Sequence, residues 1–177
     1  MENYLKQAKP ADIQQQIEQQ LDHFEDLTGS PPSFVDGHQH VHALPIVRHC
    51  LLTTLRRRYP LTTRPPIRSI RSESWRGPKA WLLNWLGGEA LSKALAAERW
   101  PTNTDFAGVY SLSASANFRT LMRGWLKSIN DCGMIMVHPG DGALSEHGPA
   151  RAAESQYLAS SQWQEDREVA SVALTNL

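Results

Sequence analysis

The sequence predicts an α/β protein in which short, mostly parallel strands alternate with helices. Helical periodicity gives way to a short apolar run four times along the 177 residues. Two of these runs end directly in chemically active residues, Asp36 and His138. Such alternation builds parallel sheets or barrels with functional groups at the carboxyl ends of the strands. The length suits one domain, residues 1–177.

The first half of the chain is expected to hold two helices, two short strands and an interrupted helical region. Apolar residues recur at three- and four-residue intervals over 13–27, which is typical of an amphipathic helix. Asp12 is expected as its N-cap and Gly29 as its terminator. The other expected ranges are a strand over 33–36, a helix over 45–58, a strand over 67–71 and helical residues over 78–99 with a break at Gly87-Gly88.

The second half continues the alternation. Met134 to Val137 is a continuous apolar run, as expected for a strand that is covered on both faces. Trp81 and Trp85, in the interrupted helical region, are expected to lie in the core. The expected ranges are strands over 106–112 and 134–137 and helices over 116–129 and 149–165.

Charge and cysteine content narrow the class of protein. Eighteen basic residues balance eighteen acidic ones, so no overall field attracts nucleic acid or an anionic membrane. The two cysteines form no Cys-x-x-Cys motif, which argues against a disulfide framework and a thiolate zinc site. The first thirty residues lack the apolar stretch of a signal peptide. We therefore expect a cytoplasmic protein without nucleic-acid or membrane partners.

A cluster of histidines is the strongest chemical signal. His38-Gln39-His40-Val41-His42 places three of the seven histidines at every second position, behind Asp36. In an extended chain these four polar side chains project to one side, about 6 to 7 Å apart. Imidazole and carboxylate are common ligands of zinc and of harder hydrolytic metals, which makes the segment a candidate metal or catalytic site. Histidines at an ordinary surface strand end are the alternative interpretation.

Two further residues are placed by their position after a strand. His138 directly follows the apolar run over 134–137, and Asp141 lies close enough to this strand end to be a site residue. Because functional groups gather at the carboxyl ends of parallel strands, His38 and His138 are expected to converge. Asp36 is expected to orient a histidine by accepting its second ring N–H, rather than to bind a metal itself.

Three segments together carry a resemblance to a known family. They are Val35 to Pro45, Met136 to Gly140, and the pattern Arg151-x-x-Glu154-x-x-x-Leu158-x-Ser160. They resemble motifs of the YdjC-like carbohydrate deacetylases, which include chitooligosaccharide deacetylases and a hopanoid-biosynthesis branch. The resemblance implies a modified (β/α) barrel that uses a divalent metal, magnesium or zinc, to remove N-acetyl groups from amino sugars.

The resemblance also implies roles for individual residues. His38 matches a metal ligand, and His138 matches a histidine that acts as an acid or steadies the developing oxyanion. His40 and His42 match histidines that line or support the site. Arg68 matches an arginine at the equivalent place in the family.

Two segments of the family pattern are not found in this sequence, and this leads to a further expectation. Family members open with a strand that ends in an Asp-Asp segment, the source of a metal ligand and the general base, and another strand carries a further ligand histidine. Neither segment is found in this sequence, which resembles the C-terminal two-thirds of such an enzyme with one of three ligands retained. We therefore expect an incomplete barrel, little activity from this chain alone, and an open sheet edge that pairs with a second copy or a partner chain.

Two alternatives to a deacetylase stay open. An amidohydrolase-like or phosphoesterase barrel also builds its site on a His-x-His at a strand end, although it uses the first strand for this purpose. The second alternative is a non-catalytic module whose open edge pairs with another chain.

Overall fold

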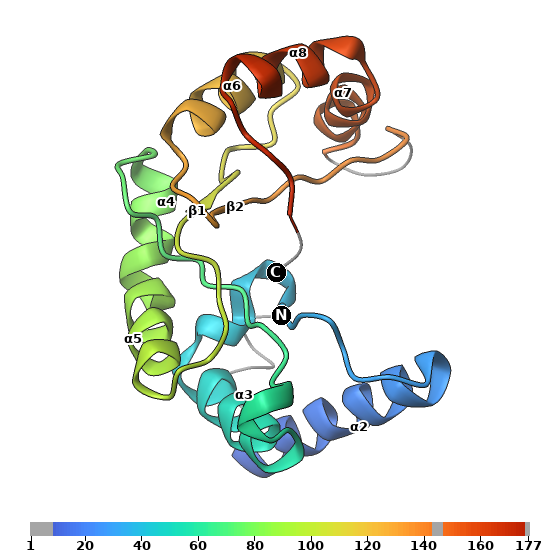
Figure 1. Cartoon of the computed structure of the whole chain (residues 1–177), viewed down its shortest axis with the longest axis vertical. Coiled ribbons are helices and arrows are strands. Elements are labelled where there is room, and N and C mark those ends of the chain that lie inside the picture. Colours follow the sequence, from blue (N-terminus) through green and yellow to red (C-terminus); the bar gives the residue numbers. More distant parts are fainter. Residues whose placement is uncertain (1–8, 143–146, 176–177) are drawn as a thin grey trace. The chain divides into compact units, whose positions relative to one another are not determined.

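The structure is a computed structural model that describes residues 9–142 and 147–175 (Figure 1). Within that part of the chain the residues form two compact units. The first unit contains residues 9–71 and 83–103, and the second contains residues 72–82 and 104–175. None of the described helices combines the length and the apolar character that crossing a bilayer requires.

The described residues form a helix-rich α/β structure with two short parallel strands. This confirms the expected class in coarse form. Most helices lie within a few residues of the expected ranges, but the single helix expected over 149–165 is wrong, because two helices, Gly148–Leu158 and Ser161–Val169, occupy this region. In chain order the elements are α2 (Pro10–Thr28), the 3-10 helix η1 (His38–Ala43), α3 (Pro45–Arg58), the 3-10 turn η2 (Leu61–Thr63), α4 (Pro78–Leu83), the π-helical turn η3 (Asn84–Gly88), α5 (Glu89–Ala97), β1 (Phe106–Ala107), α6 (Phe118–Ser128), β2 (Met134–Ile135), α7 (Gly148–Leu158) and α8 (Ser161–Val169).

The ends of α2 show which helix signals were informative. Gly29 ends the helix in the left-handed conformation, with φ of 68°, as expected. The helix begins at Pro10 and its N-cap is Lys9, so the expectation of an N-cap at Asp12 is wrong. Proline suits the first helical turn because it has no N–H that needs a partner there, and the helix begins three residues earlier than expected, nearly one turn.

Charged side chains hold α2 and α3 together in the first unit. All three arginines at the end of α3 form ion pairs with carboxylates of the same unit. Tyr59 adds a hydrogen bond from its hydroxyl group to Glu25, whose pKa is lowered chiefly by Arg58. The ion pairs join Arg56 to Glu98, Arg57 to Glu18, and Arg58 to both Asp22 and Glu25.

The strands are parallel, as expected, but much shorter than the apolar runs that predicted them. In the first unit, Val35 and Ile67 form a single parallel bridge. In the second unit, β1 pairs with β2 over two residues, with Phe106 opposite Met134. The strand expected over 106–112 ends early because Gly108 has φ of 97°, outside the strand region. The expectation of four strands of four to seven residues is therefore wrong in length.

An apolar cluster forms the core of the second unit. Aromatic rings of α6 and α7 contact one another, with the ring centroids of Phe118 and Tyr157 5.6 Å apart. Tyr110 packs against the same group, 5.9 Å from Trp125. The buried members of the cluster are Ala107, Phe118, Met122, Trp125, Leu126 and Tyr157.

The two tryptophans of the interrupted helical region are exposed, contrary to expectation. Trp81 and Trp85 are 56% and 71% exposed, so the expectation that they lie in the core is wrong. A π-helical turn lies between α4 and α5, and such a turn shifts the helical faces out of their simple periodicity. Gly87 in this turn approaches the backbone of Ala43 so closely that a Cβ atom would lie 2.5 Å from its carbonyl oxygen.

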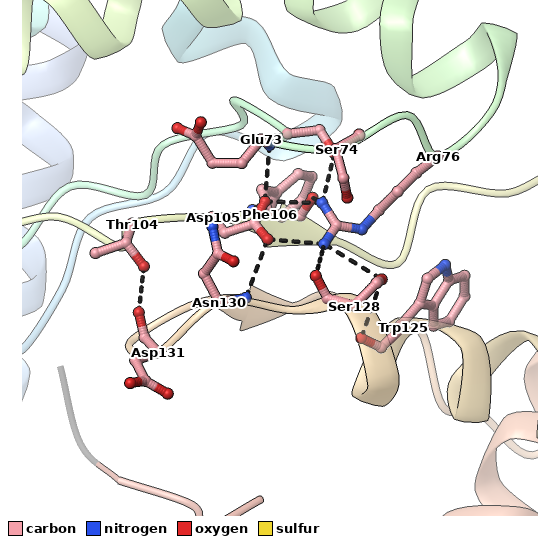
Figure 2. Close-up of polar contacts among 11 residues, drawn as sticks. Glu73, Ser74, Arg76, Thr104, Asp105, Phe106, Trp125, Ser128, Asn130 and Asp131 are labelled. Atoms are coloured by element: carbon pink, nitrogen blue, oxygen red, sulfur yellow. Dashed lines mark hydrogen bonds and ion pairs between the residues drawn. The ribbon is translucent and has the colours of Figure 1, made fainter. Parts of the chain in front are cut away.

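A buried ion pair attaches the segment before α4 to β1 in the second unit (Figure 2). Arg76 donates from Nη1 and Nη2 to the two carboxylate oxygens of Asp105, at 2.8 and 2.7 Å. The carboxylate also accepts backbone N–H groups of Glu73, Phe106 and Asn130. Burial opposes ionisation of Asp105, but these contacts outweigh it and hold its pKa below the ordinary value. No sequence pattern pointed to this pair.

Candidate functional site

The histidine segment of the first unit follows the parallel bridge at Val35, but it does not continue as an extended chain. It forms the 3-10 helix η1, in which Gln39 and His40 have φ of 52° and 62°. The expectation that alternate residues project to one side is therefore wrong, because it depended on an extended backbone. Left-handed conformations at two consecutive non-glycine residues are unfavourable and need support from the surrounding structure.

Arg68 supplies that support. It follows Ile67 in the parallel bridge, and its side chain is only 4% exposed. Its Nε donates to Asp36 Oδ1 at 2.7 Å, and its Nη2 donates to the same oxygen and lies 3.1 Å from His40 Nδ1. Since arginine carries no acceptor, His40 Nδ1 accepts this hydrogen bond, and the proton of neutral His40 resides on Nε2.

His42 is buried and uses both ring nitrogens within the segment. Its Nδ1 accepts the backbone N–H of Gly37 at 3.1 Å, and its Nε2 donates to the carbonyl oxygen of Arg68 at 2.9 Å. Burial lowers the pKa of His42, which favours the neutral ring that these two contacts require. His42 thus supports the backbone of the segment, and neither of its ring nitrogens has a lone pair available for a metal.

Asp36 binds Arg68, whereas a histidine was the expected partner. The histidine nitrogen paired with it is Nδ1 of His42, at 3.7 Å, and this nitrogen is itself an acceptor. Asp36 instead receives the guanidinium group of Arg68. Its carboxylate therefore holds the arginine that fixes His40, and the expected N–H hydrogen bond from a histidine is not what the geometry provides.

These contacts predict different effects for two neighbouring histidines. Replacing His42 by alanine leaves the Gly37 N–H and the Arg68 carbonyl without their partner, so we expect a loss of about 1–3 kcal/mol in the free energy of unfolding. The exposed His38 provides the matched control, because His38→Ala should change that free energy by less than about 0.5 kcal/mol. Urea unfolding followed by circular dichroism measures both. Equal losses in the two variants would contradict the supporting role of His42.

The described residues do not fit a divalent metal ion by themselves. Catalytic zinc sites use about three protein ligands. Over residues 9–142 and 147–175 no group of three or more histidine, cysteine, aspartate or glutamate side chains is placed to hold an ion. The metal-ligand role of His38 stays a prediction.

The second unit contains a cluster around His138, which lies three residues beyond the end of β2 because the strand is shorter than expected. Its side chain is one-third exposed, whereas Glu154 of α7 is completely buried beside it. Glu154 Oε2 accepts the backbone N–H of His138, and Oε1 accepts the hydroxyl group of Tyr110. The ring Nδ1 of His138 lies 3.8 Å from Oε1, within the range of an ion pair but beyond a hydrogen bond.

The charge of Glu154 follows from the same contacts. Burial opposes ionisation, but the His138 ring, the Tyr110 hydroxyl group and the His138 backbone amide outweigh it and lower the pKa of Glu154. Tyr110 responds in the opposite sense, because burial and the adjacent carboxylate raise its pKa. The cluster therefore presents an ionised, buried carboxylate to a partly exposed imidazole.

Sequence reasoning missed the roles of Glu154 and Tyr110. A signal existed for Glu154, because it shares the buried face of α7 with Ala150 and Tyr157 at spacings of four and three residues. A carboxylate on such a face needs a partner. Tyr110 carried no local signal, since 44 residues separate it from Glu154. Asp141 is exposed, three residues beyond His138, and its site role stays a prediction.

Comparisons with known proteins agree with the earlier resemblance. The sequence is similar to the carbohydrate deacetylase of Mus musculus, with 39% identity over 64 residues, which are 36% of this chain and 21% of that protein. The chain thus matches about a fifth of the length of this relative. No solved structure matches. The profile of the family described as YdjC-like protein matches residues 1–169, nearly the whole sequence. The chain belongs to the YdjC-like protein family.

Proposed function

We propose that this chain acts in carbohydrate deacetylation, the hydrolysis of N-acetyl groups on amino sugars, and that His138 supplies the proton for the departing amine. Family membership and the name of the mouse relative support the reaction class. The observation that carries the assignment is the His138 ring, partly exposed beyond the end of β2 and backed by the buried, ionised Glu154. An imidazole ring can both accept and donate a proton, as general acid–base catalysis requires.

The proposed architecture is a modified (β/α) barrel. The two parallel pairings, between Val35 and Ile67 and between β1 and β2, support this architecture because each precedes one of the chemical clusters.

Two histidines, His138 and His40, are proposed to act on the substrate. Hydrolysis of an amide requires a proton on the nitrogen as the C–N bond breaks, and His138 supplies it. In the first unit, Arg68 holds His40 with the proton on Nε2, a donor suited to a sugar hydroxyl group or an acetamide oxygen. His38 is proposed as a ligand of magnesium or zinc on the resemblance alone, and no step is assigned to a metal that the described residues do not fit.

Ligand binding tests this function directly. We expect N,N′-diacetylchitobiose to shift the ring signals of His138 in NMR spectra of the whole chain, because the acetamide group is the reacting group. The matched control is chitobiose without acetyl groups, which keeps both sugar rings and should cause smaller shifts. Equal shifts with both sugars, or none with either, would contradict the function and favour a non-catalytic module.

Acetate release from the same preparation separates binding from turnover. We expect little release with added magnesium or zinc, because a hydrolytic metal site needs more ligands than the described residues bring together, and each lost catalytic group lowers the rate by orders of magnitude. Release that depends on metal and is lost in His138→Ala would support deacetylation and contradict the expected weakness of this chain.

A further inference from the structure

The contact between Glu154 and His138 bears on which ring nitrogen of the imidazole carries the proton. We propose that Glu154 is a positioning residue that holds neutral His138 in the tautomer with the proton on Nδ1, so that Nε2 is the nitrogen that handles the substrate proton. The catalytic part of this inference rests on the proposed function, whereas the tautomer does not.

The carboxylate of Glu154 has lone pairs that are not yet occupied by a hydrogen bond from the described residues. Both oxygens of Glu154 already accept one hydrogen bond, from the His138 backbone N–H and from the Tyr110 hydroxyl group. Each carboxylate oxygen has a second lone pair. Nδ1 of His138 is buried and has no hydrogen-bond partner among the described residues, yet it lies 3.8 Å from Oε1. A small rotation of the ring brings Nδ1 within reach of that lone pair.

The chemistry of the two groups fixes the tautomer. An ionised carboxylate only accepts hydrogen bonds, so a lone pair on Nδ1 would face a second acceptor at a buried position. A proton on Nδ1 removes this conflict. The hydrogen bond of one ring nitrogen sets the state of the other, and Nε2 is then the nitrogen with the lone pair.

The surroundings of Glu154 hold the carboxylate rigidly. Tyr110, its hydroxyl donor, packs against Phe118 and Trp125 with ring centroids 6.0 and 5.9 Å away. On α7, two neighbours of Glu154 bind the same loop as His138. Arg151 Nε donates to the His138 carbonyl oxygen at 3.2 Å, and Ser155 Oγ donates to the Gly140 carbonyl oxygen at 2.9 Å. The helix therefore holds the backbone of the loop that carries the His138 ring.

This arrangement defines the proton path. Nε2 takes up a proton from solvent, and the resulting imidazolium is stabilised by the ionised Glu154. As the oxygen of water bonds to the acetyl carbon, the C–N bond breaks and its electron pair stays on nitrogen. The proton on Nε2 then moves to that nitrogen and the two protons of the attacking water pass to solvent, which yields the free amine and acetate. Glu154 stays ionised throughout, so it acts through His138 and does not touch the substrate.

Nitrogen NMR of the whole chain labelled at histidine tests the tautomer without any substrate. At a pH where His138 is neutral, we expect Nδ1 to show the shift of a protonated nitrogen and Nε2 that of an unprotonated one. The signals are assigned by their loss in His138→Ala. A neutral His138 with the proton on Nε2 would overturn the proposal, whatever the variants show.

Glu154→Gln provides the sharper comparison. Its amide oxygen must face the backbone N–H of His138, so its NH₂ group is directed to the side of Tyr110 and Nδ1. A donor then faces Nδ1, and we expect His138 to change to the tautomer with the proton on Nε2. Glu154→Asp keeps an acceptor and should keep the original tautomer.

Tyr110→Phe is the matched control, because it removes a hydrogen bond from the same carboxylate but leaves its charge beside Nδ1. We expect lower stability and an unchanged tautomer. A purely structural role for Glu154 predicts instead that Glu154→Gln leaves the tautomer unchanged, or that Tyr110→Phe alters it equally, and either result overturns the proposal.

Turnover separates this inference from the proposed function. In a preparation that releases acetate, we expect Glu154→Gln to lower kcat by about 100-fold or more with little change in KM. If Glu154→Gln reverses the tautomer but the protein does not distinguish acetylated from deacetylated sugar, only the proposed function is contradicted. An unchanged tautomer in an active enzyme would contradict the positioning role alone.

Discussion

Replacing Asp105 by alanine is expected to lower the free energy of unfolding of the second unit by about 3–5 kcal/mol. The change leaves the guanidinium group of Arg76, only 5% exposed, without its carboxylate. Backbone N–H groups of Glu73, Phe106 and Asn130 lose their acceptor at the same time (Figure 2). Urea unfolding followed by circular dichroism and tryptophan fluorescence measures the loss.

Two comparisons show whether the loss comes from the unpaired charge. Asp131→Ala removes an exposed carboxylate from the neighbouring loop and should change the free energy by less than about 0.5 kcal/mol. Replacing Arg76 by methionine together with Asp105→Ala should recover part of the loss, because no buried charge is then left without a partner. A double variant that is less stable than Asp105→Ala would contradict this explanation.

Gly108→Ala is expected to destabilise the second unit by about 3 kcal/mol or more. Gly108 has φ of 97°, and a Cβ atom there would lie 2.0 Å from the carbonyl oxygen of Met136. Both the backbone conformation and the contact exclude a side chain, and rotation of a neighbouring group cannot relieve a clash with backbone. Because Met136 N–H also donates to Ala107, the variant should disrupt the pairing of β1 with β2. Thermal unfolding followed by circular dichroism measures the effect.

Gly124, in α6, is the matched control for this substitution. A Cβ atom at Gly124 meets no other atom within 4 Å. Alanine favours a helix interior over glycine, so Gly124→Ala should raise the free energy of unfolding by up to about 1 kcal/mol. If the two variants unfold at the same temperature, the close approach between Gly108 and Met136 is not present in solution.

The sequence predicted the elements best where local chemistry decides them. The helix Pro45–Arg58 agrees with the expected range at both ends, because proline favours its first turn and Pro60 stops it. The parallel direction of both strand pairs followed from the alternation with helices. The lengths of the strands could not be predicted in the same way, because an apolar run does not show at which residue the pairing with the neighbouring strand ends.

The sequence singled out the histidines but did not predict the geometry of their contacts. A spacing of two between histidines fits an extended chain, whereas the turn at His40 depends on Arg68, which lies 28 residues away. The cluster of Tyr110, His138 and Glu154 likewise joins residues whose separation leaves no periodic trace. Such contacts follow from tertiary structure. The spacing along α7 could have marked Glu154 as a buried carboxylate, but it could not identify His138 and Tyr110 as its partners.

The path of the chain between the two units limits how this protein can be dissected. Residues 72–82 belong to the second unit, but residues 83–103 return to the first before the chain continues into the second. A fragment that stops at residue 71 would lack Leu91 and Leu95, which are fully buried in the first unit. A fragment that starts at residue 104 would lack Arg76 and leave Asp105 uncompensated. No single cleavage point yields two intact halves, so truncation experiments on this chain would report damaged cores rather than separable modules.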